Sequence, residues 1–317
     1  MELILKQLRG RFIEDNQLPI TTVEDPYFEE RIKMLEDECG AKTKYQSLME
    51  VIRDRFDGNI QKFLEHRHSV KDQILAHILN SEGYKAMLAD KSPLEDYKPI
   101  VGSNELYTEQ QDGGLFISFD MIKANFQALR YVDPSIVCDC NTWEEFVARF
   151  SDVEYLASAK QVRQEVLGKL NGKRLAAIEK RASNDFGKEF KYRLSIYGFS
   201  LFSIKTDEII FKFEGTEKEF ESFHAGDQEY NGFKFRVNKF KLHMRTFKRA
   251  FSDKRINVFE KEDYLNAHRR NLKCVPATYY PQVYKLLNGI KINDSDLVFT
   301  SDHELCSYMK PLELVKW

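Results

Sequence analysis

The sequence predicts an α+β protein, and three observations carry this prediction. Apolar residues recur at helical spacing, with charges between them, from residue 25 to about residue 90. Short apolar runs typical of strands follow at 115–120 and 196–213. Later segments alternate between helical and extended patterns without an internal repeat or a linker tract. We therefore expect a helical N-terminal region followed by an antiparallel sheet with flanking helices.

The first strand should end at Asp120. Gly113-Gly114 forms a turn before the apolar run that begins at Leu115. The pattern becomes helical after Asp120 and continues to about Tyr131, so Asp120 either closes the strand or caps the helix.

Further helices and two hairpins follow. Asn141 or Thr142 is a helix cap, and a second long helical segment runs from Ser158 to about Arg181 with a break near Asn171. In the apolar region 196–213, Lys205-Thr206 is typical of a hairpin tip.

The second hairpin should turn at Asn231-Gly232, a pair that favours the type I′ turn. After it, the apolar alternation shifts phase, which predicts a bulge near Asn238-Lys239. Soft boundaries near residues 95 and 215 divide the chain into a helical region 1–95, an α+β core 96–215 and a basic, aromatic-rich α+β region 216–317.

Composition limits the class of protein. With 42% hydrophobic and 31% charged residues, the chain is typical of a soluble globular protein. No apolar run approaches the roughly 18 residues of a membrane span, and the first ten residues are too charged for a secretory signal. Five cysteines, an odd number, favour reduced thiols. We expect an intracellular protein of the cytoplasm, nucleus or a viral factory, not secreted and without a membrane partner.

Positive charge is concentrated in two tracts. Between Lys160 and Arg193 there are ten Lys or Arg against four Asp or Glu, and between Arg236 and Lys273 there are twelve against four. The net charge is nevertheless only −2. Such a distribution suits a positive face for a polyanion, and it equally suits two solvated helix faces.

Acidic residues stand where two strands end, and this pattern indicates a metal site. Asp120 closes one apolar run, and Asp207-Glu208 interrupts the other. Two carboxylates at neighbouring strand ends could hold the two metal ions that catalyse nucleotidyl transfer. Taken singly, Asp120 could instead be a helix cap and Asp207 a turn residue.

These segments resemble the palm of template-directed nucleic-acid polymerases, most closely family A DNA polymerases. The likeness lies in Asp120 with the helix to Leu129, and in Thr206-Asp207-Glu208 within an apolar strand. It covers about residues 115–213, and Thr206 stands where the family has His. The spacing from Arg163 to Lys169 also departs from the family, and no Tyr-Gly follows the basic helix.

The resemblance implies a palm-like sheet and a set of roles. Asp120, Asp207 and Glu208 would be catalytic, with Mg²⁺ or Mn²⁺ held by Asp120 and Asp207. The nucleoside triphosphate would be bound by cations of the basic helix and its surroundings: Lys160, Arg163, Lys169 and Lys173. The basic tracts, rather than the resemblance, give a second set of cations that would contact nucleic acid: Arg174, Arg245, Lys248, Arg249 and Arg255.

Two other functions stay open. The chain could be a non-catalytic nucleic-acid-binding protein that keeps only a degenerate palm-like fold and a basic face. It could also be a metal-dependent nuclease in which Asp120, Asp207 and either Glu154 or Glu179 bind the metal.

Overall fold

The computed structural model describes residues 2–90, 100–170, 172–249, 254–265 and 270–315. Helices make up 51% and strands 20% of it, with helices at the N-terminus followed by an antiparallel sheet, so the predicted α+β class is confirmed. The chain forms two compact units. Unit 1 comprises Met1–His66, His243–Glu262 and His268–Trp317, and unit 2 comprises Arg67–Leu242 and Asp263–Ala267. The predicted boundary near residue 95 lies outside the described residues, and the three predicted regions stay a prediction.

Unit 2 contains the acidic residues of the candidate site, and it has helices both before and after these residues in the sequence. Its helices are α6 (Glu82–Ala89), α7 (Ala124–Val132), α8 (Trp143–Val147), α9 (Glu154–Ser158), α10 (Lys160–Leu167), α11 (Gly172–Ser195) and α12 (Glu217–Ser222), with 3-10 turns η1 (Glu109–Gln111) and η2 (Pro134–Val137). Its strands are β1 (Leu115–Met121), β2 (Phe199–Ile204), β3 (Glu208–Phe213), β4 (Gln228–Tyr230) and the first part of β5 (Phe233–Lys248). Helix α5 (Ile60–Asn80) supplies residues to both units.

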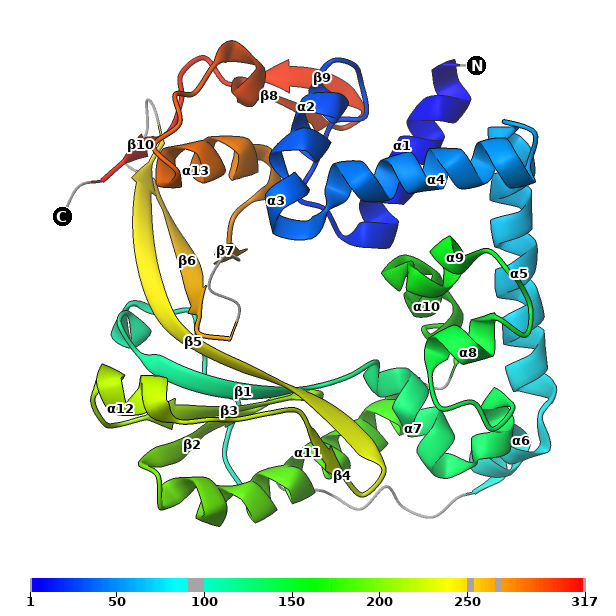
Figure 1. Cartoon of the computed structure of the whole chain (residues 1–317), viewed down its shortest axis with the longest axis vertical. Helices are drawn as coiled ribbons and strands as arrows, with labels where there is room; N and C mark the ends of the chain where they lie inside the picture. Colours follow the sequence, from blue (N-terminus) through cyan, green and yellow to red (C-terminus); the bar gives the residue numbers. More distant parts are fainter. Residues whose placement is uncertain (1, 91–99, 171, 250–253, 266–269, 316–317) are drawn as a thin grey trace. The chain divides into compact units, whose positions relative to one another are not determined.

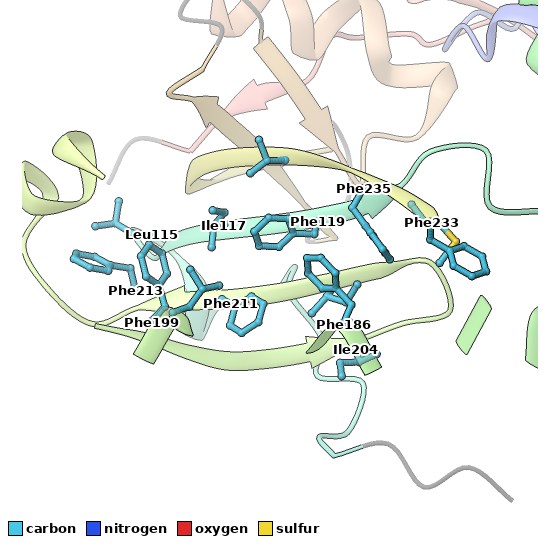
Figure 2. Close-up of a cluster of buried hydrophobic side chains, with 14 of the residues drawn as sticks. Leu115, Ile117, Phe119, Phe186, Phe199, Ile204, Phe211, Phe213, Phe233 and Phe235 are labelled. Carbon is cyan, nitrogen blue, oxygen red and sulfur yellow. The ribbon is translucent and has the colours of Figure 1, made fainter. Parts of the chain in front are cut away.

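The sheet of unit 2 is antiparallel, with strand order β2-β3-β1-β5 and with β4 paired to β5. Helix α11 lies along one face of this sheet (Figure 1). Alternate residues of β1, namely Leu115, Ile117 and Phe119, point into the apolar cluster on that face (Figure 2). The Phe119 ring lies against the Phe186 ring of α11, with 5.1 Å between their centres. Because side chains alternate along a strand, Ser118 and Asp120 point from the opposite face.

Several sequence predictions in unit 2 are confirmed. The Thr142 hydroxyl accepts a hydrogen bond from the Glu145 amide and caps α8. Strands β2 and β3 form the predicted hairpin, in which the Lys205 amide donates to the Glu208 carbonyl at 2.8 Å. Asn231 and Gly232 both have positive φ, at 50° and 81°, as a type I′ turn requires.

The predicted bulge near Asn238-Lys239 is wrong. Strand β1 pairs with β5 without interruption from Leu115↔Lys241 to Met121↔Phe235. The alternation shifts because Lys239 is buried on the face of α11 and α12, where its ammonium donates to two backbone carbonyls. Phe240, the next residue, is also buried but on the other face, where its ring stacks on Phe116. Burial of both faces, and not an extra residue, produces the change of phase.

Unit 1 contains the N-terminal helices and the C-terminal segments. Its helices are α1 (Glu2–Asn16), α2 (Tyr27–Met34), α3 (Glu36–Cys39), α4 (Ala41–Arg55) and α13 (Tyr280–Leu287), with η3 (Ala277–Tyr279) and η4 (Asp294–Leu297). Its strands are the second part of β5, β6 (Arg255–Asp263), β7 (Arg270–Lys273), the hairpin β8 (Val298–Ser301) and β9 (Glu304–Ser307), and β10 (Glu313–Leu314). A buried ion cluster joins α2 to η4: the Asp296 carboxylate, fully buried, accepts from Arg31 at 3.3 Å and from Lys285 at 2.7 Å.

Two absences apply to the residues described above. None of their helices combines the length and the apolar character that a membrane-spanning helix requires. All five cysteines, which lie among these residues, are free.

Candidate functional site

The antiparallel pairing of β1 with β3 brings the predicted acidic residues together. Asp120 on β1 lies directly opposite Glu208 on β3. The Met121 amide donates to the Asp207 carbonyl at 2.7 Å, so the ladder continues into the hairpin connection that carries Asp207. Paired positions in an antiparallel sheet share a face, with Cβ atoms about 5 Å apart. Asp120 and Glu208 are therefore neighbours on the face opposite α11.

Asp120 is not a helix cap. Strand β1 continues to Met121, and α7 begins only at Ala124, after Lys123 in the left-handed region at φ 52°. The interpretation of Asp207 as a turn residue is compatible with its place in the β2–β3 connection.

Burial and neighbouring charge act together on Asp120. Burial raises the pKa of its carboxyl, and the negative charges of Asp207 and Glu208 raise it further, to about 6. Arg236 and Lys160 oppose this rise with their positive charge. A carboxyl that resists ionisation beside two other carboxylates is typical of a site that binds a cation or moves a proton.

A fourth acidic residue, Glu179 of α11, approaches the hairpin from the other side. Its side chain is 5% exposed, and burial followed by the charge of Asp207 raises its pKa to about 7. Its Oε1 atom is buried and has no hydrogen-bond partner in the described part of the chain. One turn further along α11, the Ser183 hydroxyl donates to the Thr206 carbonyl at 3.0 Å. Helix α11 thus contacts the hairpin tip. The negative charge of Asp207 acts on both Asp120 and Glu179 and raises the pKa of each.

The other glutamate named for a nuclease lies elsewhere. Glu154 is exposed in the first turn of α9, and no interaction with the acidic cluster is found within the described residues. The sequence offered both glutamates as equals, because it does not show that α11 packs against the β2–β3 hairpin.

The four predicted triphosphate-binding cations have different surroundings. Lys160, at the start of α10, lies close enough to lower the pKa of Asp120. Burial lowers the pKa of Arg163, whose charge interacts with Glu144, a residue that is also ion-paired with Lys123. Lys169 and Lys173 are exposed, and no interaction with the acidic cluster is found for them in the described residues.

The predicted nucleic-acid-binding cations are divided between the units. Arg174 in unit 2 donates to the Asp90 carbonyl at 2.6 Å and forms an ion pair with the Asp90 carboxylate. In unit 1, the Arg249 guanidinium lies over the Tyr279 ring, 5.2 Å from its centre. The remaining members of the set are also in unit 1: Arg245, Lys248 and Arg255.

Sequence reasoning missed Arg236. This residue lies on β5 directly opposite Asp120, so Glu208, Asp120 and Arg236 form one row across three strands. The alternation of Phe233, Phe235 and Val237 indicates that Arg236 points away from the apolar face, but the partner strand of β5 cannot be deduced from that pattern.

The donor set suits a hard divalent cation, since carboxylate oxygens are the ligands that Mg²⁺ and Mn²⁺ prefer. Within the residues described, however, no group of three or more His, Cys, Asp or Glu side chains has the arrangement of a complete metal site. A cation bound here would therefore take its remaining ligands from water or substrate, as Mg²⁺ commonly does.

Comparison of the chain with protein-family models, with curated proteins and with solved structures gives no match.

Proposed function

We propose that this protein is a palm-type nucleotidyltransferase that acts on nucleic acid through a divalent-cation site at Asp120 and Asp207. The observation that carries the proposal is the row in which Asp120 and Glu208 face each other beside Asp207, with the pKa of Asp120 raised by both neighbours. Glu179 adds an independent indication, because its buried Oε1 has no partner in the described residues and its charge interacts with Asp207. Unpaired buried carboxylate oxygens are costly unless a cation or proton compensates them.

In this proposal each residue has a defined task. Asp120 and Asp207 bind Mg²⁺ or Mn²⁺, and Glu208 supports the second position. The metal supplies Lewis-acid stabilisation of negative charge on the phosphoryl group. Lys160, which already acts on Asp120, neutralises charge on the triphosphate, together with Arg163, Lys169 and Lys173.

The nucleic acid is held by cations along its backbone. Arg174, Arg245, Lys248, Arg249 and Arg255 are the residues proposed for this contact. Two of them, Arg174 and Arg249, also make contacts within the protein, to Asp90 and Tyr279 respectively. Their replacement should therefore be accompanied by a measurement of folding.

A primer-extension assay with a labelled primer-template, nucleoside triphosphates and Mg²⁺ or Mn²⁺ tests this function. The Asp120→Asn and Asp207→Asn variants should each abolish incorporation without lowering the melting temperature. Glu229→Gln is the matched control, because Glu229 is an exposed carboxylate on β4 of the same unit. Incorporation by either Asp variant at the wild-type rate would refute the assignment.

A metal-dependent nuclease is the second candidate. The position of Glu179 favours a nuclease over a non-catalytic nucleic-acid-binding protein. Glu179 acts electrostatically on the same hairpin as Asp207, as a third acidic residue of a nuclease site would. The two reactions give opposite products, since a nuclease shortens the labelled strand and a polymerase extends it. If neither product forms while the oligonucleotide still binds, the chain is a non-catalytic nucleic-acid-binding protein.

A further inference from the structure

Arg236 is the one cation in a row of charged side chains across the sheet of unit 2. The register pairs Glu208 with Asp120 and Asp120 with Arg236. Since paired residues share a face, all three side chains project from the face opposite α11, with neighbouring Cβ atoms about 5 Å apart. The main chain of β5 therefore places Arg236 beside the acidic cluster.

The N–H donors of the Arg236 guanidinium have no partner among the described residues. Its side chain is exposed, and within the described residues it makes no hydrogen bond, no ion pair within 4.0 Å and no contact with an aromatic ring. Its influence on Asp120 is a longer-range attraction. Arginine presents five N–H donors in a planar fork that matches two oxygens of a phosphate group.

Arg163 and Lys123, two other cations of unit 2, differ from Arg236 in this respect. The charge of Arg163 interacts with that of Glu144, and Lys123 forms an ion pair with the same carboxylate. If Arg236 served only to neutralise Asp120, the two side chains would be expected to form a direct ion pair. They do not form one, although the charge of Arg236 acts on Asp120. An arginine that is paired with a carboxylate residue in the sheet, and whose donors make no contact in the described part of the chain, suits a substrate that carries both metal-binding and arginine-binding oxygens.

We propose that Arg236 binds a phosphate group of the substrate beside the acidic cluster. This inference rests on the proposed function, which it extends by assigning a phosphate-binding residue that lies outside the basic helix. The phosphate belongs to a nucleoside triphosphate or to the nucleic-acid backbone, and the fork of Arg236 bridges two of its oxygens. Lys160, which acts on Asp120 from α10, contributes a second positive charge to the same group.

The test compares Arg236→Ala, Arg236→Lys and the control Lys212→Ala. Lys212 is on β3, on the same face as Glu208 and four residues further along the strand, about 13 Å away. Three quantities are measured at pH 8.5: KM for the nucleotide, Kd for a labelled oligonucleotide, and Kd for tripolyphosphate with Mg²⁺ by calorimetry. At this pH Asp120 is ionised in every variant, so removal of a nearby cation does not act through its protonation. Circular dichroism establishes that each variant is folded.

We expect Arg236→Ala to weaken phosphate binding by about tenfold to a hundredfold, the usual effect of losing a charged, bidentate hydrogen bond. Arg236→Lys should recover part of this loss, and Lys212→Ala should leave all three quantities unchanged. A rise confined to the nucleotide KM and the tripolyphosphate Kd identifies the triphosphate as the source of the phosphate. A loss confined to oligonucleotide binding identifies the backbone.

The inference and the proposed function fail differently. If the wild-type protein incorporates nucleotide and Arg236→Ala matches Lys212→Ala in all three quantities, the role of Arg236 is overturned and the function stands. If no variant, including wild type, incorporates nucleotide but tripolyphosphate binding still depends on Arg236, the polymerase function fails and the phosphate site stands.

Discussion

Neutralising Asp120 should stabilise the folded protein at alkaline pH, although it abolishes the proposed reaction. The pKa of Asp120 is raised from 3.8 to about 6 by burial and by the charges of Asp207 and Glu208. A difference of about 2 pKa units corresponds to about 3 kcal/mol of unfavourable free energy for the ionised form in the folded state. Since Asp120 is partly exposed, solvent screening reduces this to about 1–2 kcal/mol. Asp120→Asn should relieve this cost.

The direction of the pH dependence follows from the sign of the shift. A carboxyl whose pKa is higher in the folded state than in the unfolded state favours folding below the unfolded value. Its contribution is lost as pH rises through about 6. The wild-type protein loses this contribution between about pH 4 and pH 7, and Asp120→Asn does not. The variant should thus be more stable by about 1–2 kcal/mol at pH 8 and nearly equal to wild type at pH 4.

Urea unfolding followed by tryptophan fluorescence measures this difference, because Trp143 is fully buried within unit 2. The exposed control Glu229→Gln should stay within about 0.5 kcal/mol of wild type at both pH values. A variant Asp120→Asn that is destabilised at pH 8, or whose gain is the same at pH 4, would refute the reasoning. Millimolar Mg²⁺ should reduce the gain, because a bound cation relieves the same repulsion in the wild type.

Two further substitutions test the internal packing of each unit, one in unit 2 and one in unit 1. Gly187→Val should destabilise unit 2 by about 1–3 kcal/mol in urea unfolding, because its Cβ atom would already lie 2.8 Å from Ile204 Cδ1 and 3.7 Å from Ile209 Cγ2, which leaves no space for two further methyl groups where α11 packs on the hairpin; an unchanged urea midpoint would refute this close packing. Asp296→Asn should destabilise unit 1 by about 3 kcal/mol or more, because it leaves Arg31 buried with its charge uncompensated. Differential scanning calorimetry would contradict that expectation by showing an unchanged Tm.

Signals from residues close together in the sequence were sufficient to predict a turn and a helix cap. The turn at Asn231-Gly232 and the cap at Thr142 each depend on residues a few positions apart, and both are confirmed. The bulge near Asn238-Lys239 was wrong because it required knowledge of both faces of the sheet. From the sequence, a buried lysine next to a buried phenylalanine cannot be distinguished from an inserted residue.

The site was predictable only in part, for the same reason. Asp120 and Asp207 stand at strand ends, and an apolar run followed by an acidic residue is visible in the sequence. Arg236 and Glu179 join them through the pairing of β5 with β1 and the packing of α11 on the β2–β3 hairpin. These are long-range contacts, and the alternation of a strand does not specify its neighbour.

The electrostatics of unit 2 indicate why this end of the sheet differs from the rest. Both Asp120 and Glu179 have carboxyl groups whose ionisation is opposed by burial, and Asp207 adds to the cost of each. A partly buried carboxylate with a purely structural role is expected to have a cation in close contact. Glu165 is an example, because it forms ion pairs with Arg67 and Lys71 that lower its pKa to about 2. At Asp120 the same protein leaves the repulsion in place, so the folded chain tolerates a local cost that a bound cation would remove. Positions where local stability is given up in this way are those at which function is expected.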